Sequence, residues 1–211
     1  MRKAPRSSLI RISSVATIII SVAAIGLAAM PAAGESNPCD PILSSIRKQV
    51  SGPAFRTRTT IVHTDSGPSM LLQGEFIPPD RVHLITDRQE LIAILNKGTF
   101  IKPKNGSWQQ SPVDMSETLL SFRDPKVIDQ LAKDYIKSDC KQVGSETLNG
   151  QETTIWQYKT SGLSATTRIW INASDELPYK QEIEGDAAGH KSKTTQLIEY
   201  DPGIRIEPPI Q

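Results

Sequence analysis

The alternation of apolar and polar residues predicts two groups of β-strands separated by a helical segment. Runs rich in Thr, Val, Ile and aromatic residues, bounded by Gly, Pro, Asn and Asp, are typical of antiparallel strands. The first group comprises Phe55–Thr64, Met70–Ile77, Arg81–Thr86, Glu90–Leu95 and Thr99–Lys102. The second comprises Lys141–Leu148, Thr153–Thr160, Thr166–Asn172, Pro178–Glu184 and Lys193–Asp201.

The stretch Gln151–Gly185 has the clearest strand pattern, with three successive strands separated by turn-forming residues. Such a meander is marginal in water unless one of its faces is covered. We therefore expect something apolar to lie over one side of this sheet, and its nature decides the function.

Helical spacing of apolar residues occurs in three segments, Pro41–Val50, Ser116–Phe122 and Pro125–Ile136. The last two form an insertion between the strand groups. Between two strands of the first group, Pro78-Pro79-Asp80 interrupts the pattern, and this predicts a corner or an edge crossing because proline cannot sit in a central ladder.

This order of elements predicts an α+β fold. A long antiparallel sheet curls as its twist accumulates, so we expect a strongly curved half-barrel. The helices have apolar faces, and the concave side of the curled sheet is the most economical place to bury them. We expect the helical insertion to cover this hollow, with Trp156 or Tyr158 near the space beneath it.

The N-terminal residues have the charge pattern of a secretory signal peptide. Basic residues precede the uncharged run Val15–Met30, and Ala32-Ala33-Gly34 fits a small-x-small cleavage site. We therefore expect residues 1–34 to be removed on export and residues 35–211 to form a single domain in the periplasm. One alternative is an uncleaved membrane anchor, for which the run is shorter than the ~20 residues of a span. Another is a lipoprotein, for which Cys39 lacks the small-residue setting.

The charge balance argues against nucleic acid as a partner. Four of the 24 Lys and Arg residues lie in residues 1–34, so residues 35–211 carry 20 basic and 23 acidic residues, a formal charge of −3. Binding to a phosphate backbone needs clustered cations, which a mildly acidic, mixed-charge domain does not provide.

The two cysteines, Cys39 and Cys140, are predicted to form a disulfide, the usual state of such a pair in an exported protein. The chain-entropy model assigns roughly 4–5 kcal/mol, as an upper figure, to closing a loop of about 100 residues. Two unrelated buried thiols are the alternative. No second Cys pair or His cluster suggests a metal site.

Several segments resemble the superfamily of the outer-membrane lipoprotein carrier (LolA-like) and LppX-type lipid-binding proteins. These segments are Gly74–Asp87, Glu90–Lys102, Trp108, Gly150–Tyr158 and Arg168–Glu184. They match a Pro-Asp-Arg corner, a hairpin ending in Trp, and a later Trp-Ile-Asp…Leu-Pro turn, in which Asn172 here replaces the frequent Asp. The resemblance implies a half-barrel closed by helices that holds acyl chains or other hydrophobic ligands without catalysis.

No residue pattern recommends catalysis, a cofactor or a metal. His63, His83 and His190 have no metal-ligand spacing, and solvated or hydrogen-bonded histidines explain them. The sequence has no G-x-S-x-G, H-E-x-x-H, phosphate-loop or dinucleotide motif. An exported hydrolase is therefore the least favoured class.

Large apolar side chains are the remaining candidates for a ligand site. By the two-residue period of a strand, Met70, Leu72 and Phe76 share one face, and Trp156 and Tyr158 share another. The candidate ligand-binding residues are Met70, Leu72, Phe76, Leu131, Trp156 and Tyr158. Ordinary core packing is the alternative, because a cavity wall and a packed core use the same side chains.

Two classes of function follow. The first is a periplasmic carrier or sensor of a lipid or an acylated protein, which holds its hydrophobic ligand between the sheet and a helical lid. The second is a module that binds an envelope protein, such as an envelope-stress regulator, with the same fold and no lipid.

Overall fold

The computed structural model describes residues 37–63, 70–121, 124, 126–130, 139–159, 165–187 and 190–210. All of these residues belong to one compact unit, Ser36–Gln211. The predicted signal peptide, residues 1–34, and the candidate ligand residue Leu131 lie outside the described residues.

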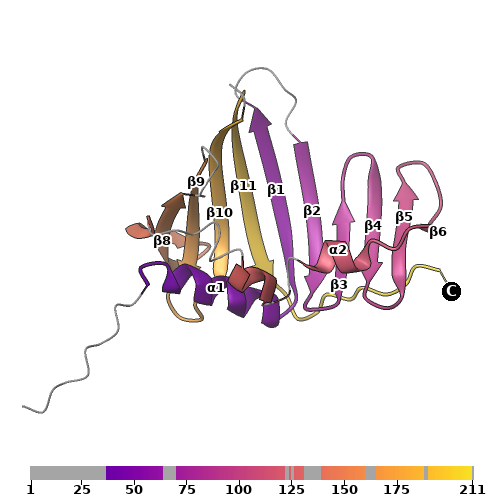
Figure 1. Ribbon diagram of the computed structural model, residues 1–211, viewed down its shortest axis with the longest axis horizontal. Coiled ribbons are helices and arrows are strands. Elements are labelled where there is room, and N and C mark those ends of the chain that lie inside the picture. The colour runs from indigo at the N-terminus through magenta and orange to yellow at the C-terminus, as the bar shows by residue number, and fades with distance from the viewer. Residues whose placement is uncertain are drawn as a thin grey trace, which may run out of the picture. The chain divides into compact units, whose positions relative to one another are not determined.

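The described strands form one antiparallel sheet in the order β6-β5-β4-β3-β2-β1-β11-β10-β9-β8-β7, which is curved and unclosed (Figure 1). The strands are β1 Phe55–His63, β2 Met70–Ile77, β3 Arg81–Ile85, β4 Gln89–Ile94, β5 Gly98–Pro103, β6 Gln109–Gln110, β7 Lys141–Leu148, β8 Gln151–Lys159, β9 Ala165–Asn172, β10 Pro178–Ala187 and β11 His190–Tyr200. All ten strands predicted from the sequence are present. The short β6 is an addition.

The helices α1 (Asp40–Ser51) and α2 (Ser116–Ser121) pack on the same face of the sheet. The helix α1 packs against Ile169 of β9, and α2 packs against Val82 of β3. The strand register places these two residues on one face. Directly opposed residues in β10, β11 and β1 lead from Ile169 to Leu72 of β2. Leu72 shares its face of β2 with Phe76, which lies opposite Val82. We call this face the concave face and the opposite one the outer face. The predicted α+β half-barrel with helices on its concave side is confirmed.

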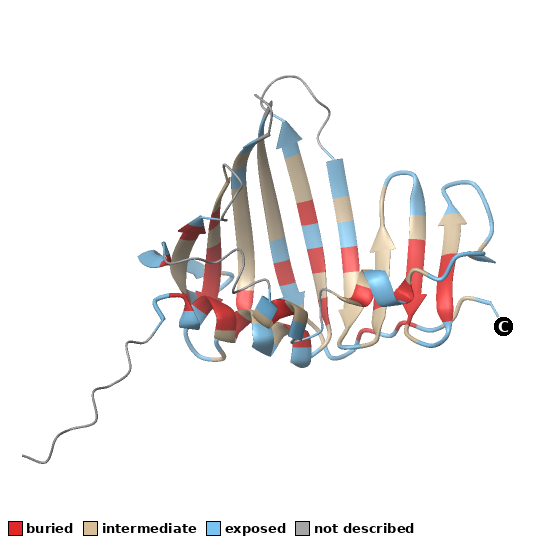
Figure 2. Cartoon of the chain, in the orientation of Figure 1, coloured by how far each residue is buried: buried red, intermediate tan, exposed pale blue. Residues whose placement is uncertain are grey.

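Three apolar clusters stabilise this arrangement. Two lie on the concave face, one beneath α1 and one beneath α2. The third lies on the outer face, where Ile204 and Ile206 of the C-terminal segment cover Ile92, Ile94 and Phe100. Figure 2 shows the buried residues gathered toward the ends of the strands that lie nearest the helices.

Two turns illustrate how local sequence sets the strand order. Asn149 and Gly150 have φ angles of 50° and 80°, as a tight hairpin between β7 and β8 requires, and the sequence predicted this turn. The prediction of a corner at Pro78 and Pro79 was wrong, because these residues form the turn of a hairpin between β2 and its neighbour β3. They lie outside the ladder and so leave both central strands intact.

The predicted disulfide between Cys39 and Cys140 is present. Cys39 precedes α1, and Cys140 precedes β7. Both lie in the cluster beneath α1, with Ile42 and Tyr158. The bond therefore fastens α1 to the edge of the sheet at which β7 begins.

Candidate functional site

Four of the six predicted ligand residues mark the ends of two rows that cross the concave face. We name the rows the Met70 row and the Leu72 row. The Met70 row consists of the directly opposed residues Met70, Ile61, Thr194, Ile183, Thr167 and Tyr158. The Leu72 row consists of Leu72, Thr59, Gln196, Gln181, Ile169 and Trp156. Both rows run from β2 through β1, β11, β10 and β9 to β8.

The concave face carries only neutral side chains over most of its width. In the described strands β1–β5 and β9–β11, every Arg, Lys, Asp and Glu lies at a position that the register assigns to the outer face. On β1, for example, Arg56 and Arg58 project outward, whereas Thr57, Thr59 and Ile61 face the concave side. An uncharged concave surface of this kind suits an apolar or neutral ligand, because no charge has to be desolvated when the ligand binds.

Burial changes along the two rows. At the β8 end, Tyr158 is buried and Trp156 is half-buried, and both pack against the cluster beneath α1. At the β2 end, Leu72 and Ile61 are half-buried and Met70 is 48% exposed. The β8 end is thus packed core, and the β2 end is the part of the rows that a ligand can contact.

The helix over Tyr158 and Trp156 is α1, although the sequence analysis placed the later helical insertion over them. The described part of the insertion comprises α2, which lies elsewhere on the concave face, and residues 126–130, which contact α1. Its helix α2 packs against β3 and β4, and Asp129 forms an ion pair with Arg47 of α1 at 2.7 Å. Leu131 lies outside the described residues, so its predicted role remains a prediction.

Phe76 lies apart from the two rows, closer to α2. Its ring stacks on that of Phe55 with centroids 4.9 Å apart, and it packs against the cluster that contains Val82 and Leu120. In this position Phe76 stabilises the junction of β1, β2 and α2.

The middle of the Leu72 row is polar but uncharged. The side-chain amide of Gln196 donates a hydrogen bond to the Thr59 hydroxyl at 3.1 Å. Gln181 lies beside Gln196 and hydrogen-bonds with Tyr158, whose pKa is raised because burial disfavours the phenolate. We call Thr59, Gln196 and Gln181 the polar ledge. Thr59 is buried, whereas Gln196 and Gln181 are half-buried, so the two side-chain amides are the groups of the ledge that a ligand can contact.

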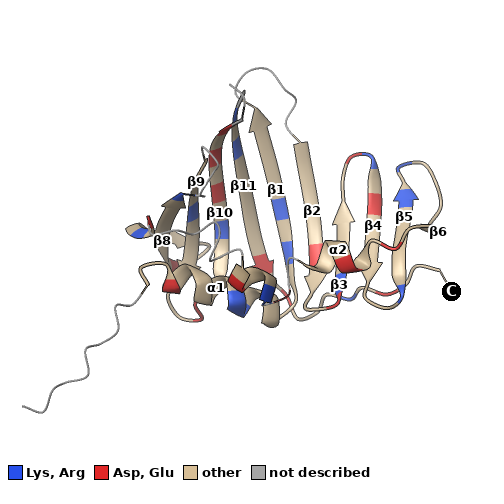
Figure 3. Cartoon of the chain, viewed as in Figure 1, with Lys and Arg blue, Asp and Glu red and all other residues tan. Residues whose placement is uncertain are grey.

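The outer face differs in charge, and acidic and basic residues occupy neighbouring strands there (Figure 3). Glu182 forms ion pairs with Lys180 at 2.9 Å and Lys193 at 3.1 Å. Burial raises the pKa of Glu182, but the hydrogen bonds from these two lysines and their charges lower it by more. The pKa of Glu182 is therefore below its ordinary value. The Lys180 ammonium also lies 4.1 Å from the centre of the Trp170 ring. These pairs balance the charges on the part of the outer face that β9, β10 and β11 form.

His83 belongs to this charged surface and has polar partners there, as the sequence predicted. Its ring nitrogens lie 3.5 Å from Glu75 and 3.3 Å from Glu90. A hydrogen bond from Lys102 lowers the pKa of Glu90. Among the described residues, no group of three or more His, Cys, Asp and Glu is arranged to bind a metal.

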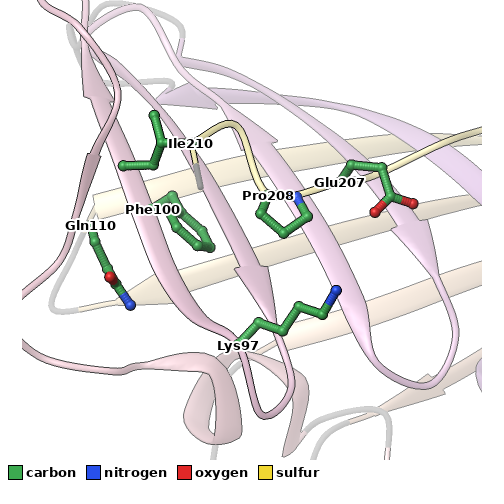
Figure 4. A pocket seen from close by; sticks show the side chains of 6 residues that line it. All are labelled: Lys97, Phe100, Gln110, Glu207, Pro208 and Ile210. Carbon is green, nitrogen blue, oxygen red and sulfur yellow. The ribbon is translucent and has the colours of Figure 1, made fainter.

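A separate hollow of about 550 Å³ lies at the other end of the sheet, near β5, β6 and the C-terminal segment. Figure 4 shows its lining, which combines three apolar and three polar side chains: Lys97, Phe100, Gln110, Glu207, Pro208 and Ile210. Arg81 holds the C-terminal segment here through Glu207 at 2.8 Å and the Ile206 carbonyl at 2.7 Å. None of the predicted ligand residues that the structure describes lines this hollow, and sequence reasoning did not find it.

Sequence reasoning also missed the partners that complete the two rows. Ile61, Ile183 and Thr194 come from strands far apart in the sequence, and only the pairing of β1 with β11 places them side by side. The alternation within each strand was the available signal, but the register between distant strands cannot be derived from it.

No protein-family model matches the sequence, and neither does any curated protein. Among solved structures of similar fold, MucB has a TM-score of 0.49 at 14% identity, covering 82% of this chain and 62% of MucB. The MucA/MucB complex from Pseudomonas aeruginosa has a TM-score of 0.46 at 13% identity, with 80% and 59% covered. This chain thus spans less than two thirds of these MucB chains.

A LolA superfamily protein from Nitrosomonas europaea is also similar, with a TM-score of 0.34 at 11% identity, covering 81% of this chain and 94% of that protein. These likenesses concern the fold alone. The architecture itself is the one that the sequence predicted, an open, curved antiparallel sheet with helices on its concave side. Within the described residues, none of the helices is long and apolar enough to cross a membrane.

Proposed function

We propose that this chain is an exported, non-catalytic binding protein of the periplasm. Its concave face holds a hydrophobic ligand, either a lipid or the acyl chain of a lipoprotein. The ligand lies along the β2 end of the Met70 and Leu72 rows, between Met70, Leu72 and Ile61.

The observation that carries this proposal is the division of charge between the two faces. All charged side chains of the described β1–β5 and β9–β11 occupy outer positions, and the concave positions are neutral. A sheet with two solvated faces has no need of such a division. The partly exposed apolar side chains at the β2 end of this neutral face support a hydrophobic ligand there.

Apolar burial supplies enough free energy for such binding. Each methylene removed from water contributes about 0.8 kcal/mol before ordering costs. A chain of about a dozen methylenes can therefore bind at useful affinity without any charged contact. Such a site tolerates changes in the polar head group and discriminates mainly by chain length.

Titration with a fluorescent fatty-acid probe tests the proposal. We expect saturable binding to the folded, delipidated protein and competition by unlabelled long-chain fatty acid. A short-chain acid such as butyrate is the matched control and should not compete, since it has too few methylenes to bury. Absence of saturable binding by correctly folded protein would contradict the lipid proposal.

Export is a separate part of the proposal, supported by the signal-like residues 1–34. N-terminal sequencing of the protein from the periplasmic fraction should find a chain that begins near Glu35. A chain that begins near Met1 and sediments with membranes would contradict cleavage.

The polar ledge favours a second candidate, the binding of an envelope protein. The half-buried side chains of Gln196 and Gln181 can exchange hydrogen bonds with the main chain of an extended peptide, which an acyl chain cannot do. A lipid found by mass spectrometry in protein extracted from its native envelope favours the first candidate. A copurified peptide or protein without lipid favours the second.

A further inference from the structure

Among the described strands, the eight-residue β7 forms one edge of the sheet. It stands last in the strand order, next to β8, and its residues Lys141–Thr147 are exposed. The strand at the opposite edge, β6, has only two residues. An edge strand presents main-chain N–H and C=O groups that can pair with another strand.

The register shows which residues of β7 present these groups. The Ala173 amide donates to the Glu152 carbonyl at 2.9 Å, so the main chain of Glu152 points toward β9. By alternation, Thr153 points toward β7, and its partner Glu146 points back toward β8. The main-chain groups of the neighbouring residues Ser145 and Thr147 therefore point away from the sheet.

A bulge at Val143 changes this alternation. The register shifts between Gln142 and Gly144, so that Gln142 pairs with Trp156 and Gly144 with Ile155. Because of the extra residue, the main-chain groups of Gln142 also point away from the sheet, three positions before Ser145.

Two copies of β7 that run antiparallel place complementary side chains opposite each other. With a two-fold axis between Val143 and Gly144, Gln142 lies opposite Ser145 of a second strand, and both have outward main-chain groups. Lys141 then lies opposite Glu146, and Val143 opposite Gly144, so that a cation meets an anion and a branched side chain meets a glycine. Lys141 and Glu146 both project to the outer face, as cross-strand partners must.

We propose that β7 pairs with β7 of a second copy of this chain, antiparallel and about this two-fold axis. The pairing joins two half-barrels into one continuous sheet. Symmetric self-pairing is the commonest form of protein association, and each contact on one side recurs on the other.

Two features of the strand prepare it for pairing. The Cys39–Cys140 disulfide holds the residue directly before Lys141. The Trp170 indole donates to the Glu146 carboxylate at 2.7 Å and so positions the anion at this edge. Both reduce the conformational freedom lost on association. Since an interface of one strand is small, we expect a weak dimer in the micromolar range.

Charge reversal tests the register. Sedimentation equilibrium of the purified chain should show a monomer–dimer equilibrium that Lys141→Glu weakens about tenfold or more, because Glu then faces Glu146. Glu146→Lys should do the same by placing two lysines opposite each other. An equimolar mixture of the two variants should regain dimer, because each interface then contains two Lys–Glu pairs.

A proline substitution tests the main-chain pairing separately. Ser145→Pro removes an outward N–H without removing a hydrogen bond to β8, so it should abolish the dimer, whereas Ser145→Ala should keep it. Lys141→Glu and Ser145→Pro leave the Trp170–Glu146 bond in place, and thermal unfolding checks that both variants are folded. A wild-type chain that stays monomeric up to about 1 mM, or a dimer unaffected by Ser145→Pro, overturns the proposal.

Discussion

Met70 and Tyr158 lie at opposite ends of a single row of directly opposed residues on the concave face. One end of the row is buried beneath α1, and the other is half open to solvent. The row thus joins a structural core to a candidate binding surface without a break in the sheet. This relationship implies that substitutions at the β8 end affect stability, whereas substitutions at the β2 end affect binding.

Reduction of the Cys39–Cys140 disulfide should destabilise the protein. The bond joins residues 101 positions apart, and the chain-entropy model assigns roughly 4–5 kcal/mol, as an upper figure, to such a closure. Urea unfolding with and without reductant measures the difference in the free energy of unfolding. A Cys39→Ser/Cys140→Ser variant is the control and should not respond to reductant. Equal unfolding midpoints for the wild type in both conditions would contradict the prediction.

The buried Tyr158 should make the fold sensitive to alkali. Burial raises the pKa of Tyr158 above its ordinary value of 10.0. Its contribution to stability is therefore fully present below pH 10 and is lost as the pH rises from there through the folded pKa. The free energy of unfolding, measured from about pH 9 to about pH 11, should fall less steeply in Tyr158→Phe than in the wild type. Parallel profiles for the two proteins would show that Tyr158 does not control this loss.

Substitutions in the polar ledge should distinguish a lipid from a peptide ligand. Thr59→Val together with Gln196→Leu removes a hydrogen-bonded pair and leaves side chains of similar size. If an acyl chain lies on the ledge, its affinity should increase roughly fivefold, because no polar group is desolvated. A peptide that exchanges hydrogen bonds with the ledge should bind more weakly instead. Isothermal titration with each ligand class decides between these outcomes.

The local pattern of the sequence predicted the elements but not their neighbours. Alternation in Met70–Ile77 and Thr153–Thr160 showed which side chains share a face, because the period of a strand is two residues. It could not show that Met70 and Tyr158 belong to one row, since this depends on the pairing of Phe55 with Tyr200 at the two ends of the domain. Tertiary packing decides such register.

The helices illustrate the same limit. An apolar stripe shows that a helix is buried but not which strands it covers. The stripe on α1 therefore did not reveal that Ile42 and Leu43 pack near Tyr158, or that α2 packs against β3 and β4. The cover of the outer face by Ile204 and Ile206 was also unpredictable, because an irregular segment has no period to detect.

The most direct test of hydrophobic binding on the concave face compares two neighbouring residues of β2. Leu72 faces the concave side, opposite Thr59, whereas Leu71 faces the outer side and is 38% exposed. Leu72→Trp fills the proposed site, and Leu71→Trp adds the same volume to the other face. In titrations with the fluorescent fatty-acid probe, we expect Leu72→Trp to weaken binding about tenfold or more and Leu71→Trp to bind as the wild type does. Equal affinities in both variants, or a loss confined to Leu71→Trp, would contradict a ligand site on the concave face.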